Sequence, residues 1–149
     1  MKAAGFMVAV AIAAFGLMPT SALSSTPELA HKVEVVGDVT YISGGVGKSE
    51  AEAMRSVAKD YALEVVFVQK QAQVEEFLAE VNVQIQDAQK HVVLDVITDG
   101  PYLLANLPQG RYLVIAEYEG AVKQQWVRVG IKKHQKIVFW WPIPIINSP

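Results

Sequence analysis

The segment 103–120, LLANLPQGRYLVIAEYEG, constrains the fold of this chain more than any other part of the sequence. Pro108 presets φ for a tight turn, and Gly110 is expected at a positive-φ position that a side chain would resist. Residues 111–118 then form a predicted strand with Tyr112 on its core-facing side. A turn followed by such a strand predicts an antiparallel β-sandwich, in which Pro108, Gly110 and Tyr112 have structural roles.

Strand-length segments recur about every ten residues over the C-terminal half, as they do in sandwich folds. Apolar and polar residues alternate from Phe77 to Gln86, which predicts one half-buried strand with its apolar side toward the core. The sandwich is therefore expected over 77–141. Its other predicted strands cover 91–97, 102–107, 111–118, 121–129 and 136–141.

The N-terminal part changes from a strand pattern to a helical pattern. Residues 32–42 are rich in β-branched side chains, and 63–68 (LEVVFV) predicts another strand. Between them, Ser49 and Glu52 form a predicted capping box at the start of a helix. Apolar residues at a spacing of 3.6 share one face of that helix: Met54, Val57, Ala58 and Tyr61. These patterns predict a strand–helix–strand element over 32–70 that packs on the sandwich or extends it, and a mostly β (α+β) fold.

The first 22 residues have the pattern of a secretory signal peptide. Met1-Lys2 is a short basic start, an apolar stretch follows over 3–18, and Thr20 and Ala22 are the small residues that a signal peptidase reads. A retained membrane anchor is the alternative, but the apolar stretch is shorter than the roughly 20 residues that span a bilayer. We therefore expect cleavage after Ala22, a periplasmic chain without a stable membrane anchor, and a flexible leader over 23–31.

Charge and cysteine content argue against several classes of partner and site. The sequence has 13 Lys and Arg against 15 Asp and Glu, and its first 22 residues hold one Lys and no acid, so the mature chain has a net charge of −3. A mild negative charge without a basic stripe argues against nucleic acid and anionic membranes as partners. The absence of Cys excludes disulfides, thiolate metal sites and cysteine nucleophiles.

Residues 44–49, GGVGKS, match the end of a nucleotide-binding phosphate loop, in which backbone N–H groups and Lys hold phosphates and Ser binds Mg²⁺. The complete motif needs another Gly five residues before Gly47, and Ile42 stands there instead. The single predicted helix also cannot cover both faces of the parallel sheet that such a fold requires. We therefore expect a glycine turn before a capped helix, and no bound nucleotide.

Few residues could perform catalysis or bind a metal. The three histidines, His31, His91 and His134, lack the spacing of metal ligands, and we expect them to be solvated. No Ser stands beside a suitable His and Asp for acyl transfer. Three aspartates could form a carboxylate pair, but two of them occupy turn positions where Asp is expected for backbone reasons: Asp87, Asp95 and Asp99 are the three candidates. We predict no catalytic residues, no metal and no cofactor, and hence no enzyme.

The C-terminal segment is rich in apolar and aromatic residues. Trp140 and Trp141 are adjacent in the last predicted strand and must point to opposite faces, so one core cannot hold both. In one interpretation, one of them fills the core and the other packs on the N-terminal helix. In the other, an exposed patch of Trp140, Trp141 and Ile143 binds a partner. The strand has no charge after Lys136, so its edge is expected either to lie under the Pro-rich apolar tail 142–149 or to accept a partner segment.

Several motifs in the C-terminal half are similar to those of the carboxypeptidase regulatory-like domain, which is a transthyretin-like β-sandwich. They are VNVQIQD at 81–87, DGPYLL at 99–104, LPQGRY at 107–112 and AEYEG at 116–120. The resemblance covers about residues 77–139, and the whole chain resembles small exported proteobacterial proteins with this module. It implies a non-catalytic module in a Gram-negative periplasm, without shared catalytic residues.

The sequence as a whole favours a non-catalytic periplasmic sandwich that binds an unknown protein partner, or assists assembly, through a sheet edge and its C-terminal aromatic residues. A carbohydrate-binding module is the alternative, with Trp126, Trp140, Trp141 or the tyrosines as stacking platforms. A small hydrolase or metal enzyme is a third class, which a carboxylate cluster in a cleft would indicate.

Overall fold

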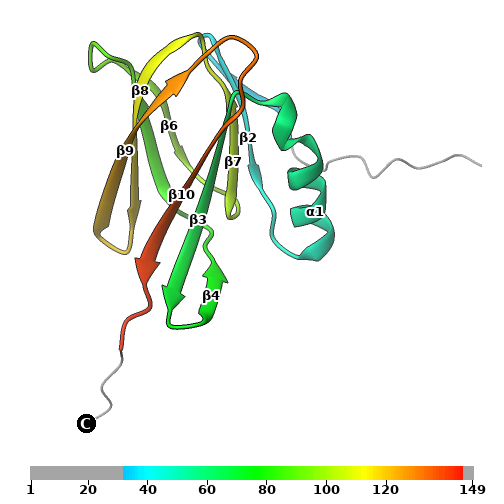
Figure 1. The fold of residues 1–149 in the computed structure, drawn as a ribbon, viewed down its shortest axis with the longest axis vertical. Helices are drawn as coiled ribbons and strands as arrows, with labels where there is room; N and C mark the ends of the chain where they lie inside the picture. Colours follow the sequence, from blue (N-terminus) through cyan, green and yellow to red (C-terminus); the bar gives the residue numbers. More distant parts are fainter. Residues whose placement is uncertain (1–31, 146–149) are drawn as a thin grey trace, which may run out of the picture.

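A computed structural model describes residues 32–145, which form two facing β-sheets with a helix on the outside (Figure 1). The prediction of a mostly β sandwich is confirmed. The helical elements are α1 (Lys48–Val57) and the short η1 (Ala58–Asp60). The strands are β1 (Glu34–Val36), β2 (Val39–Gly44), β3 (Leu63–Gln71), β4 (Val74–Phe77), β5 (Asn82–Gln86), β6 (Val92–Ile97), β7 (Tyr102–Asn106), β8 (Gly110–Tyr118), β9 (Ala121–Val129) and β10 (Gln135–Pro142).

The first sheet has the strand order β1-β2-β7-β3-β10, and β4 also pairs with β3. Its pairs are antiparallel except that β10 runs parallel to β3, from Gln135 opposite Leu63 to Pro142 opposite Lys70. β2 and β3 flank β7, so the predicted strand–helix–strand element extends this sheet. The last strand of the chain thus pairs with a strand from the first half of the chain.

The second sheet, β6-β5-β8-β9, is antiparallel throughout and encloses the main core together with the first sheet. Residues alternate between the core and the outer face, as a period of two predicts. Tyr112 lies on the core side of β8, as expected. In the middle of the core, the rings of Phe67 and Phe139 stack with their centroids 6.3 Å apart.

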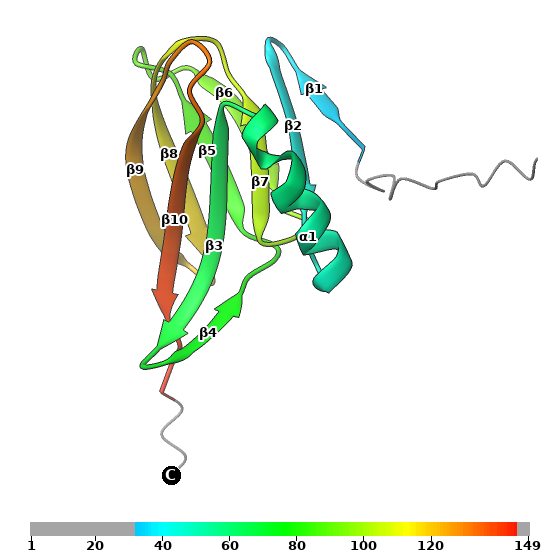
Figure 2. The same cartoon turned by 45° about the vertical axis from the view of Figure 1, so that its right-hand side comes forward.

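Helix α1 packs on the outer face of the first sheet (Figure 2). Met54 and Ala58 are buried there in a second, smaller core with Ile42, Val66 and Leu104 of the sheet. All four residues of the predicted apolar helix face belong to this cluster, which confirms that face. The strand β3 is consequently covered on both sides.

The prediction of one strand over 77–86 is wrong. β4 ends at Phe77 in the first sheet, and β5 begins at Asn82 in the second sheet. Between them the chain crosses from one sheet to the other, with Leu78 buried and Phe77 exposed. Apolar residues continue to alternate through the crossing, so the local pattern does not reveal the break.

The predicted capping box at Ser49 is also wrong. α1 begins at Lys48 with Gly47 as its N-cap residue, and no side chain caps it. Gly47 has a φ of 84°, a conformation that favours glycine. The carboxylate of Glu50, in the first turn, instead accepts a hydrogen bond from the Gly45 N–H at 3.2 Å. The acidic residue therefore links the helix to the glycine loop.

The turn at 107–112 is closed by Tyr112. Its hydroxyl donates a hydrogen bond to the Pro108 carbonyl oxygen at 2.6 Å. The expected positive φ at Gly110 is wrong, because Gly110 is not among the residues with positive φ. A Cβ at this position would meet the Tyr112 ring at 3.6 Å, which is ordinary van der Waals contact. The geometry of the turn therefore depends on the Tyr112 hydroxyl and not on a glycine conformation.

We expect Tyr112→Phe to lower the free energy of unfolding by about 1 kcal/mol, because it removes this hydrogen bond. The control Gly110→Ala should change it by less than about 0.5 kcal/mol. Burial, and secondarily the Asp87 carboxylate, raise the pKa of the Tyr112 hydroxyl above its ordinary value. The stabilisation is therefore complete below about pH 10 and is lost as the pH rises further. Urea unfolding at neutral and alkaline pH tests this, and equal losses in the two variants would contradict it.

The predicted signal peptide (1–22) and leader (23–31), His31 included, lie outside the described residues, as do residues 146–149 of the predicted tail. Within 32–145, no helix is long and apolar enough to cross a membrane.

Candidate functional site

The two adjacent tryptophans of β10 point to opposite faces, as predicted. Trp141 is 2% exposed in the sandwich core, where its indole N–H donates to the Ala121 carbonyl oxygen at 3.0 Å. Trp140 is 54% exposed on the outer face of the first sheet, with the Lys123 ammonium 4.9 Å from its ring centroid. The interpretation in which the second Trp packs on the helix is wrong, because Trp140 is exposed and does not belong to the cluster under α1 (Figure 2).

β10 is an edge strand of the first sheet. β3 pairs with one of its sides, and no strand within residues 32–145 pairs with the other. β9, the edge strand of the second sheet, lies beside it in both ribbon views, but the two form no hydrogen-bonded ladder (Figures 1 and 2). Beyond the strand, Ile143 is half-buried and its N–H donates to the Lys70 carbonyl oxygen at 3.3 Å. The sandwich therefore presents an open strand edge next to Trp140.

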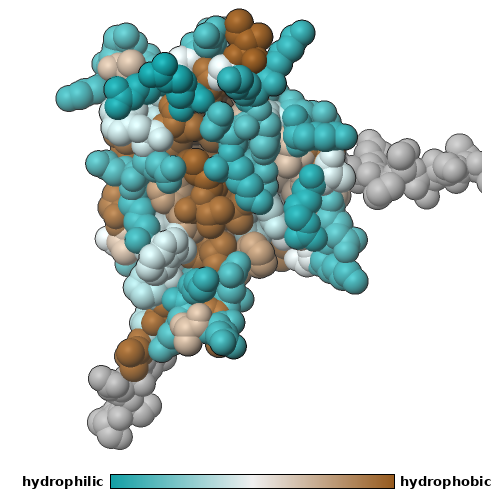
Figure 3. Space-filling view, viewed as in Figure 1, coloured by the Kyte–Doolittle hydropathy of each residue, from teal (hydrophilic) through white to brown (hydrophobic). Residues whose placement is uncertain are grey.

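Apolar side chains continue from Trp140 across the outer face of the sheet. The strand registers place Trp140 beside Val68 of β3, and Val68 beside Phe77 of β4. Val68 is buried, whereas Phe77 is 55% exposed and Val138, on the same side of β10 as Trp140, is also exposed. Figure 3 shows a hydrophobic band that runs down this face between hydrophilic margins. We call Val138, Trp140, Val68 and Phe77 the apolar strip.

A pocket adjoins the strip where β3 changes its pairing partner. Along one edge, β3 pairs first with β7 and then with β4. At the change, the Phe67 N–H donates to the Pro101 carbonyl oxygen and the Phe67 carbonyl accepts from the Leu78 N–H, each at 3.0 Å. The pocket measures about 490 Å³, and the first two turns of α1 form one of its walls. Its lining includes Gly45, Val46, Lys48, Ala51, Arg55, Phe77 and Pro101.

The glycine loop 44–47 forms another wall of this pocket through close packing. Gly45 has a φ of 99°, and a Cβ on it would overlap the ring of Tyr102. A Cβ on Gly100 would likewise overlap the backbone of Gly44. Close packing therefore accounts for Gly45, and the positive φ at the start of α1 accounts for Gly47. Lys48 stands at the first turn of α1 with its side chain exposed.

We expect Gly45→Ala to lower the free energy of unfolding by more than 1 kcal/mol, because backbone strain and the clash with Tyr102 act together. Gly47→Ala is the matched control: its φ is 84°, yet no atom lies within 4 Å of the added methyl group, so strain acts alone and the loss should be smaller. Thermal unfolding of both variants measures the difference. A Gly45→Ala protein as stable as Gly47→Ala would show that the packing on Tyr102 is unimportant.

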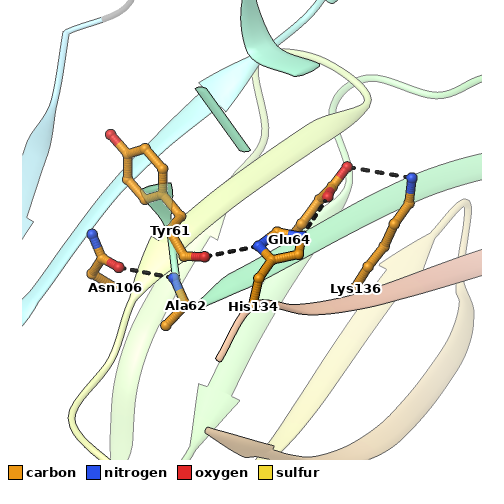
Figure 4. A network of polar contacts seen from close by, with 6 residues as sticks. All are labelled: Tyr61, Ala62, Glu64, Asn106, His134 and Lys136. Atoms are coloured by element: carbon orange, nitrogen blue, oxygen red, sulfur yellow. Dashed lines mark hydrogen bonds and ion pairs between the residues drawn. The ribbon is translucent and has the colours of Figure 1, made fainter. Parts of the chain in front are cut away.

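His134 joins the segment before β3 to the segment before β10 (Figure 4). Its Nδ1 lies 2.9 Å from the Tyr61 carbonyl oxygen, and its Nε2 lies 2.9 Å from Oε2 of Glu64. Both partners are acceptors, so both contacts are hydrogen bonds when each ring nitrogen carries a proton. Glu64 is buried, and the Lys136 ammonium lies 3.5 Å from its other oxygen. His134 is exposed, as predicted, but both of its ring nitrogens have protein partners that the sequence did not indicate.

We expect His134→Ala to lower the free energy of unfolding by about 1–3 kcal/mol, because the buried Glu64 carboxylate loses a hydrogen-bond donor. His91→Ala is the control, since the His91 side chain is 78% exposed and contacts Asp87 within a surface turn. Its effect should stay within about 0.5 kcal/mol. Chemical denaturation of the two variants compares these values. A loss in His134→Ala no larger than in the control would mean that the network contributes no net stability.

The three predicted aspartates accept hydrogen bonds from different partners. Asp87 accepts backbone hydrogen bonds within its turn, foremost from the His91 N–H, and these bonds hold the pKa of its carboxyl below the usual range. Asp95 of β6 accepts a hydrogen bond from the side chain of Gln84 on β5, and Asp99, in the loop after β6, accepts one from Ser43 of β2. Among the described residues, no group of three or more potential ligands could hold a metal ion.

The second sheet also has an exposed tryptophan, Trp126, whose surroundings differ from those of Trp140. Trp126 is 45% exposed on β9, and the Arg111 guanidinium lies 4.3 Å from its ring centroid. The same outer face has a shallow pocket of about 280 Å³ whose lining includes amide and carboxylate side chains: Asn82, Gln84, Asp95 and Glu117. The outer face that carries Trp126 therefore offers amide and carboxylate groups, whereas the strand neighbour of Trp140 on β3 is the apolar Val68.

Sequence reasoning identified Trp140 but missed most of the surface beside it. Phe77 was expected to face the core, and Arg55 was assigned no role. The available signal was the spacing of Lys48, Ala51 and Arg55, which places them on one face of a helix. That face lines the pocket.

No protein-family model matches the chain, and no curated protein is significantly similar to it. The resemblance to the carboxypeptidase regulatory-like domain therefore stays a prediction that rests on the motifs within 81–120.

Proposed function

We propose that this protein is a non-catalytic periplasmic β-sandwich that binds a partner protein through the apolar strip and the open edge of β10. The observation that carries the proposal is the 54% exposure of Trp140 on an edge strand, while the adjacent Trp141 is buried. A contiguous exposed apolar surface on a soluble protein marks an interaction site more often than a scattered one does. Tryptophan is also among the residues that contribute most to the binding energy of protein interfaces.

An extended segment of the partner fits this surface. The outer side of β10 offers backbone N–H and C=O groups to an added strand, and alternate side chains of that strand would lie toward the apolar strip. Proteins usually protect such edges with charged residues or proline. The run from Ile137 to Trp141 has no charge, and Pro142 stands only at its end.

The periplasmic location and the family are part of the same proposal and rest on the sequence. The pattern of residues 1–22 supports export. The motifs within 81–120 support a carboxypeptidase regulatory-like, transthyretin-like module, and the two-sheet fold is compatible with one. The non-catalytic role rests on the lack of a nucleophile–base arrangement in the sequence.

A carbohydrate-binding module is the second candidate, and the outer face of the second sheet favours it. The ring of Trp126 could stack on the C–H face of a sugar, and the neighbouring amides and carboxylates could bond its hydroxyl groups. The Arg111 guanidinium already lies over the Trp126 ring, which leaves less of the ring for stacking.

The test replaces Trp140 by Ala and uses Trp126→Ala as a matched control. Both are exposed tryptophans with a cation near the ring, and they stand on opposite sheets. Partners captured from periplasmic extract by the wild-type protein are identified and then titrated against each variant. We expect Trp140→Ala to weaken the main partner by about thirtyfold or more, as loss of a central aromatic residue does. Its free energy of unfolding should change by less than about 1 kcal/mol.

Trp126→Ala should bind the partner as the wild type does, and hydrogen exchange of the β10 amides should slow in the complex. Equal binding by Trp140→Ala and the wild type would refute the proposed surface. Loss of binding in Trp126→Ala alone, together with oligosaccharide binding that the same change removes, would favour the carbohydrate module instead.

A further inference from the structure

The pocket beside α1 has the size and lining of a small-molecule site. Its volume of about 490 Å³ lies within the range of about 300–1,000 Å³ that is usual for such sites. Most of the side chains that line it are apolar: Val46, Ala51, Phe77, Ala79 and Pro101. We propose that this pocket binds an unbranched fatty acid, with Arg55 holding the carboxylate.

α1 supplies the charge complementarity for a carboxylate. Lys48, Ala51 and Arg55 follow one another at helical spacing and line the pocket, so the helix presents a cation, a small apolar residue and a second cation. No acidic residue is among those described that line it. A fully apolar ligand would form no ion pair with Lys48 or Arg55, and a cationic ligand would be repelled by them.

Arg55 is the cation with a fixed position. Its Nη1 donates a hydrogen bond to the Tyr102 hydroxyl at 3.0 Å, and Tyr102 is buried. A guanidinium has five N–H donors in a planar fork, and the bond to Tyr102 uses one of them. The fork matches the two oxygens of a carboxylate better than the ammonium of Lys48 does. The alkyl chain then lies along Ala51 toward Val46.

The walls around Arg55 are pre-organised. Tyr102 stacks on Phe77 with their ring centroids 6.0 Å apart, and the Gly45 backbone packs on the other part of the Tyr102 ring. Glu50 holds the Gly45 N–H through a hydrogen bond, so its carboxylate is directed to the loop. Because these contacts are made within the protein itself, binding is expected to require little ordering of the walls.

The test titrates the protein with decanoate below its micelle concentration, and with decan-1-ol and decyltrimethylammonium as neutral and cationic analogues of the same chain. We expect decanoate to bind at one site, decanol to bind about tenfold more weakly, and the cation not to bind. Arg55→Gln should weaken decanoate about tenfold and leave decanol unchanged, since only the charge-assisted bond is lost. Amide shifts of Gly45 and Gly47 in NMR spectra should locate the ligand at this pocket.

Three controls isolate the pocket. Arg111→Gln, a change to an exposed arginine on the second sheet, should bind decanoate normally. Ala79→Phe should fill the pocket and abolish decanoate binding, and thermal unfolding checks that this variant folds. If it does not fold, the affinities of Arg55→Gln for decanoate and decanol test the proposal instead. Trp140→Ala should bind decanoate as the wild type does, so failure of this site and failure of the partner surface are distinguishable.

Four results would overturn the proposal. They are no binding of decanoate, equal affinity for decanol, a larger loss in Lys48→Gln than in Arg55→Gln, and full binding by a folded Ala79→Phe protein.

Discussion

The position of β3 is the constraint on which the rest of the structure depends. Its inward side chains, such as Phe67, pack against the second sheet, and its outward side chains, such as Val66, lie in the cluster under α1. One edge of β3 pairs with β10, and the other pairs first with β7 and then with β4. A parallel pair needs a long connection, and here the connection from β3 to β10 includes the whole second sheet. The open edge of β10 and the pocket both follow from how these partners meet β3.

Much of this fold could be predicted from the sequence, because periodicity reports burial. The β-rich composition of 63–68 indicated a strand, and the helical spacing that includes Met54 indicated the apolar face of the helix. The predictions of local structure were wrong where a tertiary contact determines the conformation of the chain. Alternation continues past Phe77 although the chain changes sheets there. At the start of α1, the Gly45 N–H donates a hydrogen bond to the Glu50 carboxylate, which links the helix to the glycine loop in a way that the sequence pattern does not indicate.

Less of the candidate site could be predicted, because its parts come from strands that are distant in the sequence. The alternation of adjacent residues in a strand was enough to separate Trp140 from Trp141. It did not show that Lys123 would lie near the exposed ring, since that depends on two edge strands meeting across the sandwich. The contact of His134 with Glu64 joins residues 70 positions apart, and it exists only in the parallel register of β10 with β3.

The placement of the two proposed sites on one face has a physical consequence. Trp141 of β10 faces the core, while Trp140 faces outward on the surface where we propose that the partner binds. Phe77 belongs both to the apolar strip and to the pocket lining, and it stacks on Tyr102, which also bonds Arg55. A ligand in the pocket and a partner on the strip would therefore both contact Phe77. Any effect of one ligand on the affinity for the other must be reciprocal. The free energy of this coupling can be no larger than the difference between each ligand's binding free energies for the alternative orientations of the Phe77 ring.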